Sequence, residues 1–309
     1  MGLGIVFSGQ GNQSLDMFQG IAANPVIATE LAQLSSRLGY PLLPQITLSE
    51  ADLFHNRNAQ PLIAGLGYLQ WQILQPELPL PVAFAGYSLG ELTAYAAAGA
   101  WDFKQLIELA VKRAALMDEA AGNWQANSLL AVSGVTQTVL AQIYHRCQCF
   151  IAIQNSAENW VVGGTIDNLQ QLMADLVQTV PNVKLTPLKV DVASHTPLLA
   201  TAAEQFINIL SGCAGGELNS PVIASVNAAT IYSVEDGLPL LARQIATTIH
   251  FSQTIAIMQE LGATVILELG AGNALSRIIG GLELGIEVHS INDFKTFSGA
   301  LNWVKKRLG

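Results

Sequence analysis

The sequence predicts an α/β protein of two lobes, a large lobe around a central, mostly parallel sheet and a smaller lobe inserted into it. Three observations support this class. Short apolar runs such as Leu3–Ser8 and Val265–Leu269 are typical of buried parallel strands. In Pro81–Trp101, a serine turn flanked by glycines joins another apolar run to an Ala-rich helix. From Asn123 onward, strand and helix patterns follow in the order β-α-β-β-α-β, which is the ferredoxin-like split arrangement.

Composition limits the classes of function. The 309 residues are 50% hydrophobic and only 12% charged, which is typical of a well-buried globular protein. A net charge of −9 argues against general nucleic-acid binding, because a phosphate backbone needs a basic surface. Polar residues interrupt each apolar run before the roughly 18 residues that span a bilayer, and the amino terminus has no basic segment. We therefore expect a cytoplasmic protein with no membrane partner.

The three cysteines, Cys147, Cys149 and Cys213, include a C-x-C pair. No second pair or histidine-rich cluster completes a metal site. We expect buried, reduced thiols and no bound metal.

The elements of the large lobe follow from apolar spacing and from Gly and Pro signals. We expect it to be hydrolase-like and to comprise residues 1–124 and 193–309, with Gln60-Pro61 opening one of its helices. Besides the strands named above, it has predicted strands at Val82–Ala85 and Val222–Val226, and helices at Pro25–Leu38, Leu62–Leu74, Phe103–Ala121, Thr201–Leu210, Leu238–Ile249 and Phe251–Leu261.

The smaller lobe is expected over residues 125–192, with a ferredoxin-like arrangement. Its predicted strands are Ser128–Val132, Phe150–Gln154, Trp160–Gly163 and Lys184–Val192, and its predicted helices are Thr136–Cys147 and Ile166–Val177.

Ser88 is the candidate nucleophile. Gly86 and Gly90 stand two residues on either side of it, in the G-x-S-x-G pattern of a nucleophile elbow. Without Cβ atoms, these glycines let a strand fold tightly into a helix, so that the serine hydroxyl is exposed at the apex. An ordinary Gly-rich turn is the alternative, but the flanking strand and helix favour the elbow. The backbone N–H of Leu89 would then face charge that develops beside Ser88.

His195 is the candidate general base, because it follows the predicted strand Lys184–Val192 directly and no other histidine has such a position. A packing or capping histidine is the alternative. No acidic residue between Ser88 and His195 makes a convincing third member of a triad, since most of them fall in the inserted lobe. A Ser–His pair oriented by a backbone or amide carbonyl suits a transferase, which must disfavour water as acceptor.

Two further features have open interpretations. The loop Gly9-Gln10-Gly11-Asn12-Gln13 leaves the carboxyl end of a predicted central strand, where open α/β sheets build their sites, but it could be a plain glycine turn. Arg113 lies in the middle of a predicted helix. Spacing alone favours a solvated side chain or a pair with Glu108 or Asp118, and the alternative is a carboxylate clamp in the active site.

Together the motifs resemble malonyl-CoA:acyl-carrier-protein transacylases, the family of the malonyl transferase of fatty-acid synthesis and the acyltransferase domains of polyketide synthases. The resemblance covers nearly the whole chain, and several separate motifs in the right order are far more specific than any one of them. It is carried by Phe7-Ser8-Gly9-Gln10-Gly11-Asn12-Gln13, Gln60-Pro61, Gly86-Tyr87-Ser88-Leu89-Gly90-Glu91, Arg113 with Met117, Asn155-Ser156, Ala193-Ser194-His195, Asn227, Gln244 and Glu268–Gly272.

The resemblance implies a ping-pong mechanism in which Ser88 is acylated and His195 acts first as base and then as acid. It implies that the amides of Gln10 and Leu89 form the oxyanion hole and that a carbonyl of Gln244 orients His195.

The resemblance also implies substrates and partners. Malonyl-CoA would donate the acyl group, and the phosphopantetheine thiol of an acyl carrier protein would accept it. Arg113 would hold the malonyl carboxylate through two parallel hydrogen bonds, and Asn155 and Gln10 would also bind substrate. No metal or redox cofactor is implied, and the family default is a monomer.

The sequence departs from the family pattern at two positions. Tyr87 precedes the nucleophile where histidine is usual, and Ser8 replaces the usual proline. The motif Val192-Ala193-Ser194-His195 is similar to that of methylmalonyl-selective acyltransferases, with Val192 in place of tyrosine. Malonyl or methylmalonyl preference therefore stays open, as does the choice among fatty-acid, trans-acting polyketide and malonate decarboxylase enzymes.

Two competing hypotheses remain at this point. One is a serine esterase or thioesterase on the same elbow, for which Arg113 would have no use. The other is a scaffold subunit with a degenerate site, against which the joint presence of Ser88, His195, Arg113 and Gln10 argues. Carrier docking would need local basic residues on an acidic protein. Candidates are Lys184, Lys189, Arg277 and Lys305-Lys306-Arg307.

Overall fold

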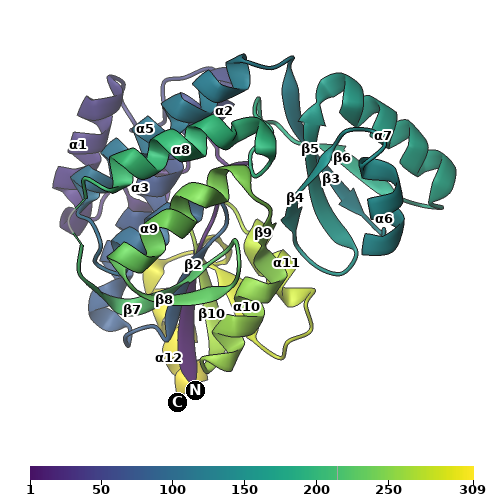
Figure 1. The fold of residues 1–309 in the computed structure, drawn as a ribbon. Coiled ribbons are helices and arrows are strands. Elements are labelled where there is room, and N and C mark those ends of the chain that lie inside the picture. Colours follow the sequence, from purple (N-terminus) through teal and green to yellow (C-terminus); the bar gives the residue numbers. More distant parts are fainter. Residues whose placement is uncertain (214) are drawn as a thin grey trace.

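The structure, a computed structural model, describes residues 1–213 and 215–309, and a six-stranded sheet lies at the centre of its large lobe (Figure 1). The strand order is β11-β10-β1-β2-β7-β8, and every adjacent pair is parallel except β7 and β8. The strands are β1 (Gly2–Phe7), β2 (Ala83–Gly86), β7 (Glu217–Ala224), β8 (Ala229–Ser233), β10 (Ala263–Leu269) and β11 (Glu287–Ser290). The predicted α/β class with a mostly parallel sheet is confirmed.

Alternate residues of the strands pack into two separate layers. On β1, Ile5 and Phe7 belong to one apolar core and Val6 belongs to the other, as the period of two requires. The first core includes helices α3 (Asn56–Leu74), α4 (Leu89–Ala97), α5 (Phe103–Gly122), α8 (Ala200–Leu210), α9 (Val234–Arg243) and α12 (Phe297–Leu308). The second includes α10 (Phe251–Glu260) and α11 (Ala274–Gly280). Outside α3 lie α1 (Ala28–Leu38) and α2 (Glu50–Phe54).

The smaller lobe is the teal body in Figure 1. It comprises β3 (Asn127–Ser133), α6 (Gln137–Tyr144), β4 (Phe150–Gln154), β5 (Asn159–Thr165), α7 (Ile166–Thr179) and β6 (Lys184–Pro187), in the predicted chain order. These strands pair antiparallel in the order β6-β3-β5-β4. One face of their sheet packs against α6 and α7. On the other face, Leu129, Ile153 and Val161 join the second core, which includes α10 and α11.

A two-residue strand from the large lobe extends the small sheet. This strand, β9 (Ile249–His250), pairs parallel with β4, with Ile249 opposite Ile153. The hydroxyl of Thr248 also donates a 2.6 Å hydrogen bond to the carbonyl of Ile151. The predicted helix Leu238–Ile249 is therefore wrong in its second half. Ile245 and Ile249 have helical spacing, but α9 ends at Arg243, a 3-10 turn follows, and Ile249 is buried by pairing with another sheet.

Other predicted boundaries are wrong as well. The strand predicted over Val222–Val226 begins at Glu217 and ends at Ala224. The strand predicted over Lys184–Val192 ends at Pro187, because beyond it the chain leaves the edge of β3 and crosses to the large lobe. The predicted helix Leu62–Leu74 begins earlier, at Asn56, so that Pro61 lies in its second turn.

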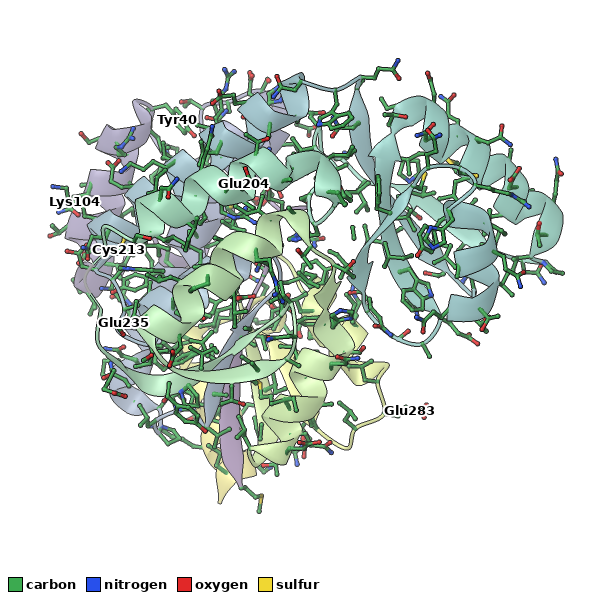
Figure 2. The ribbon with its side chains drawn as sticks, viewed as in Figure 1. Tyr40, Lys104, Glu204, Cys213, Glu235 and Glu283 are labelled. Atoms are coloured by element: carbon green, nitrogen blue, oxygen red, sulfur yellow. The ribbon has the colours of Figure 1, made fainter. Side chains whose placement is uncertain are left out.

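Charged side chains mostly face outward. Lys104, Glu204 and Glu283 lie on the outside of the molecule in Figure 2, and all three are exposed. Buried charges therefore stand out, and two of them, Glu91 and Arg113, lie near the carboxyl ends of β1 and β2.

Candidate active site

The turn between β2 and α4 has the backbone of a nucleophile elbow. Ser88 lies at φ 55° and ψ −113°, which is rare for a residue other than glycine and stores strain. A Cβ atom on Gly86 would collide with the backbone of Gly90, and one on Gly90 would collide with the carbonyl group of Phe7. Both glycines are therefore required by the close approach of strand, turn and helix.

Ser88, His195 and Gln244 form a hydrogen-bonded chain. Nε2 of His195 lies 2.7 Å from Oγ of Ser88, and Nδ1 of His195 lies 2.6 Å from the main-chain carbonyl oxygen of Gln244. A carbonyl can only accept, so Nδ1 carries the proton and donates it. Nε2 is then the unprotonated nitrogen and accepts the hydrogen bond of the serine hydroxyl. This is the arrangement in which a histidine can remove the proton of Ser88.

His195 is held in place by its turn rather than by a strand end. The prediction that it follows a strand directly is wrong, because β6 ends at Pro187 and His195 itself has φ 62°. Its N–H donates to the carbonyl of Ile245 at 2.7 Å, and the N–H of Ala193 donates to Oδ1 of Asn127 at 2.7 Å. Both lobes therefore fix the turn.

The imidazole of His195 is 1% exposed. Burial and the nearby charge of Arg113 lower its pKa to about 3, against the opposing effect of the Gln244 carbonyl. The imidazole is therefore neutral near pH 7, as a general base must be.

Arg113 reaches the site from α5. It is 1% exposed, Nη1 donates to Oε1 of Gln60 at 2.9 Å, and Nη2 donates to Oε1 of Gln244 at 3.2 Å. The interpretation that it pairs with Glu108 or Asp118 is wrong, because Glu108 pairs with Arg37 and Asp118 accepts from Asn56.

The guanidinium of Arg113 keeps its charge. Burial lowers its pKa to about 10, with Glu91 acting in the opposite direction, so it is protonated at neutral pH. Within residues 1–213 and 215–309, no group accepts a hydrogen bond from its Nε. A buried donor without an acceptor needs an explanation, and an oxygen of a bound ligand would supply one.

The side chain of Gln244 joins three parts of the site. Its Nε2 donates to the main-chain carbonyl of Ser88 at 3.0 Å and to Oε2 of Glu91 at 2.8 Å, while its Oε1 accepts from Arg113. The carbonyl of Gln244 was assigned a role from the sequence, whereas Glu91 and Gln60 were named only within motifs, without a role, and Ser225 was not found. The signal for Glu91 was a carboxylate in an otherwise apolar, Ala-rich helix.

Glu91 is fully buried, which raises the pKa of its carboxyl, and the hydrogen bonds of Ser225 and Gln244 and the charge of Arg113 oppose that shift.

Gln10 and Leu89 lie at equivalent places on neighbouring loops. Phe7 of β1 pairs with Gly86 of β2, and Gln10 and Leu89 each come three residues later. A Cβ atom on Gly9 would lie 2.6 Å from the carbonyl oxygen of Tyr87, so the two loops are in close contact. Leu89 is the first residue of α4, so its N–H has no partner in that helix. Nε2 of Gln10 is buried and has no partner among the described residues.

Asn155 approaches the elbow from the small lobe. It is 9% exposed, and its side chain opposes the strong rise in the Tyr87 pKa caused by burial. The Tyr87 ring packs edge-on against Phe251, with 5.1 Å between ring centroids. Asn155 also lines a cleft of about 410 Å³ together with Trp160 and Arg277. Its Oδ1 lacks a partner among the residues that the structure describes.

All three cysteines are free, with Cys147 and Cys149 buried and Cys213 partly exposed. In the described ranges, no group of three or more His, Cys, Asp or Glu side chains could hold a metal ion. No helix there combines the length and apolar character needed to cross a bilayer.

A strained serine at an elbow, a neutral histidine on its hydroxyl and a buried arginine beside them define an enzyme that passes acyl groups through a serine ester. The family of acyl transferase domains matches residues 5–279, and the chain belongs to this family. It is an acyltransferase.

Relatives of known name match most of the chain. The malonyl CoA-acyl carrier protein transacylase of Synechocystis sp. is 27% identical over 272 residues, which cover 88% of this chain and 90% of the relative. The structure of FabD from Acinetobacter baumannii matches with a TM-score of 0.89 and 28% identity, over 99% of this chain and 98% of that one. The malonyl-transacylase PlMCAT, solved in complex with a type II PKS acyl-carrier protein, matches with a TM-score of 0.91 and 27% identity, over 98% and 99%.

Proposed function

We propose that this acyltransferase moves a malonyl group from malonyl-CoA, through an ester on Ser88, to the phosphopantetheine thiol of an acyl carrier protein. The observation that carries the proposal is the state of Arg113. Its buried, charged guanidinium is held by two neutral amide oxygens and keeps Nε free within the described residues. A buried cation to which no carboxylate of the described residues is hydrogen-bonded is suited to bind one from a substrate, and the malonyl group supplies it.

The reaction follows from the geometry of Ser88 and His195. Nε2 of His195 takes the hydroxyl proton while Oγ attacks the thioester carbonyl, and the C–S bond breaks as the coenzyme A sulfur receives that proton. The carrier thiol then gives its proton to Nε2 and attacks the Ser88 ester, which restores the serine hydroxyl. The N–H groups of Leu89 and Gln10 are proposed to bind the oxyanion of both tetrahedral intermediates.

The cleft lined by Asn155 is proposed to receive the thioester arm, with the carrier protein at its mouth. The names of two relatives support a carrier as partner, since one is a malonyl CoA-acyl carrier protein transacylase and the other was solved in complex with an acyl-carrier protein. Among the basic candidates, Lys305 pairs with Glu77 and Arg307 pairs with Glu287. Arg277 lines the cleft itself, so we favour it as the docking cation.

We also infer that residues 1–124 and 193–309 form a hydrolase-like lobe and residues 125–192 a ferredoxin-like lobe. The parallel order around the elbow strand supports the first, and the antiparallel order β6-β3-β5-β4 supports the second. A monomer is proposed.

The test is intact mass after mixing the protein with malonyl-CoA, methylmalonyl-CoA or acetyl-CoA, beside Ser88→Ala and Arg113→Ala. A malonyl adduct that is absent in Ser88→Ala and weaker in Arg113→Ala is the expected result. The ratio of malonyl to methylmalonyl adduct measures the extender preference. Fast release of coenzyme A and free acid without an adduct would instead favour a serine esterase or thioesterase.

A further inference from the structure

Glu91 is a buried charge that the mechanism above does not use. It is 0% exposed on α4, three residues after the nucleophile. Its Oε2 accepts hydrogen bonds from the N–H of Ser225 at 3.0 Å, from the hydroxyl of Ser225 at 2.5 Å and from Nε2 of Gln244 at 2.8 Å. Removing a carboxylate from water costs several kcal/mol unless other groups compensate. Packing alone therefore does not explain why the carboxylate of Glu91 is buried.

Two of the three hydrogen bonds to Glu91 have one possible direction. The N–H of Ser225 and the amide nitrogen of Gln244 can only donate, so Oε2 of Glu91 is an acceptor in both. Oε1 has no partner within the described ranges, so a proton placed there would have no acceptor. Burial raises the pKa of this carboxyl, whereas its hydrogen bonds and the charge of Arg113 favour the ionised form, in which Oε2 accepts all three bonds.

An acceptor at this place decides which way the Gln244 amide faces. Nε2 must point to Glu91 and to the carbonyl of Ser88, and Oε1 is then left to accept from Arg113. If the amide turned over, its NH₂ group would face the guanidinium, two donors with no acceptor between them. Gln244 also holds the carbonyl that orients His195, so the orientation of this one residue matters to both halves of the site.

Glu91 compensates the charge of Arg113 without occupying its hydrogen-bond donors. Within the described residues no carboxylate pairs directly with Arg113, and the neutral amide of Gln244 lies between the two charges. A direct ion pair would fill the donors that a substrate carboxylate needs. Because the amide of Gln244 separates Glu91 from Arg113, these donors stay open.

We propose that Glu91 is a positioning residue, ionised in the folded enzyme, which fixes the Gln244 amide so that Arg113 stays open for a substrate carboxylate and His195 stays aligned on Ser88. The Arg113 part rests on the proposed function. The His195 part concerns the reactivity of Ser88 alone and does not depend on which acyl group is used.

The test compares Glu91→Gln with Glu268→Gln. Glu268 is also 0% exposed, and its carboxylate accepts from the N–H groups of Leu275 and Ser276 without contact to the site residues. Both changes replace a buried carboxylate with an amide of the same shape, so general effects of the exchange should be alike. Two rates are measured for each: labelling of Ser88 by a fluorophosphonate and acylation by malonyl-CoA. Thermal unfolding checks that each variant is folded at the assay temperature.

The expected result is that Glu91→Gln slows acylation by malonyl-CoA roughly 10- to 100-fold, the range for losing a hydrogen bond to a charged group, and slows labelling about 10-fold. Glu268→Gln should change either rate by less than about 2-fold. Adding Glu91→Gln to Gln244→Met should cost less than about 2-fold more, because residues that act through one another are not additive.

Equal effects of Glu91→Gln and Glu268→Gln, or additive effects with Gln244→Met, would overturn the proposal. If Glu91→Gln does not fold, Gln244→Met carries the test, because it cuts the link between Glu91 and Arg113 at similar volume. Unchanged rates in Gln244→Met would overturn it as well. If the unaltered enzyme is labelled but is not acylated by malonyl-CoA, the proposed function fails, and the labelling rates still decide the role of Glu91.

Discussion

Nε2 of His195 lies 2.7 Å from Oγ of Ser88, although 107 positions separate the two residues in the chain. Both residues have positive φ, at 62° and 55°. Two strained turns from different parts of the sequence thus meet to make one reactive pair, and such strain persists only where the surrounding structure enforces it.

Removing the base should slow acylation far more than removing any other histidine. His195→Ala is expected to lower the rate of Ser88 acylation by about 10²- to 10⁴-fold, the contribution of a positioned base. Release of coenzyme A, followed with a thiol reagent, measures this rate. His145→Ala is the matched control, because His145 is exposed in the small lobe. A loss of similar size in the control would contradict the assignment.

The pH dependence of acylation should be flat where histidine catalysis usually fades. Burial and Arg113 hold the pKa of His195 at about 3, so the base stays neutral and active from pH 8 down to pH 5. Single-turnover rates across this range check the prediction, with a thioester whose own charge does not change. A decline centred near the ordinary histidine value of about 6.5 would show that the imidazole is in contact with water.

The same shift should make the fold sensitive to acid. The folded pKa lies below the unfolded value, so between about pH 6.5 and pH 3 the unfolded chain binds the proton and stability falls as pH falls. His195 should contribute a slope of at most about 1.4 kcal/mol per pH unit. Urea unfolding at pH 7 and pH 5 measures it. The slope should shrink in His195→Gln, and equal slopes in the two proteins would refute this account.

The elbow should not accept a single added methyl group. A Cβ atom on Gly90 would collide with the carbonyl of Phe7, which is backbone and cannot move aside cheaply. Gly90→Ala is expected to destabilise the fold by about 1–3 kcal/mol or more and to abolish acylation. Gly122→Ala is the control, because a Cβ atom there meets nothing within 4 Å. Chemical denaturation compares the two, and equal stability would mean that the elbow is looser than described.

Charge alone should not replace the guanidinium. Arg113→Lys keeps a cation but cannot bond Gln60, Gln244 and a substrate carboxylate in one plane. We expect malonylation to fall about 10- to 100-fold while acetylation changes little. Competition between malonyl-CoA and acetyl-CoA, measured by intact mass, gives the ratio. An unchanged ratio would remove Arg113 from acyl-group selection.

Local features of the site could be predicted from the sequence, and long-range ones could not. The elbow is specified within five residues, so Ser88 and its glycines were found from spacing. His195 was found by its position in the chain, but the turn that holds it depends on Asn127 and Ile245, which no local pattern reveals. Its predicted place at a strand end was wrong for that reason.

The environment of Arg113 could not be predicted from local spacing either. Spacing alone offered Glu108 and Asp118 as partners, whereas its true partners lie 53 and 131 positions away. Both are neutral glutamines, and no rule of charge pairing would have selected them. Only the resemblance to a family pointed to the correct environment.

The pairing of β9 with β4 has a consequence for exchanging parts between related enzymes. The small sheet is completed by Ile249–His250, which lie far along the chain from residues 125–192. A graft of that segment alone would separate β4 from the strand that covers its edge and leave the carbonyl of Ile151 without the hydroxyl of Thr248. Chimeras that aim to change the carrier or the acyl donor should therefore carry residues 248–250 together with the small lobe, because both segments contribute to one sheet.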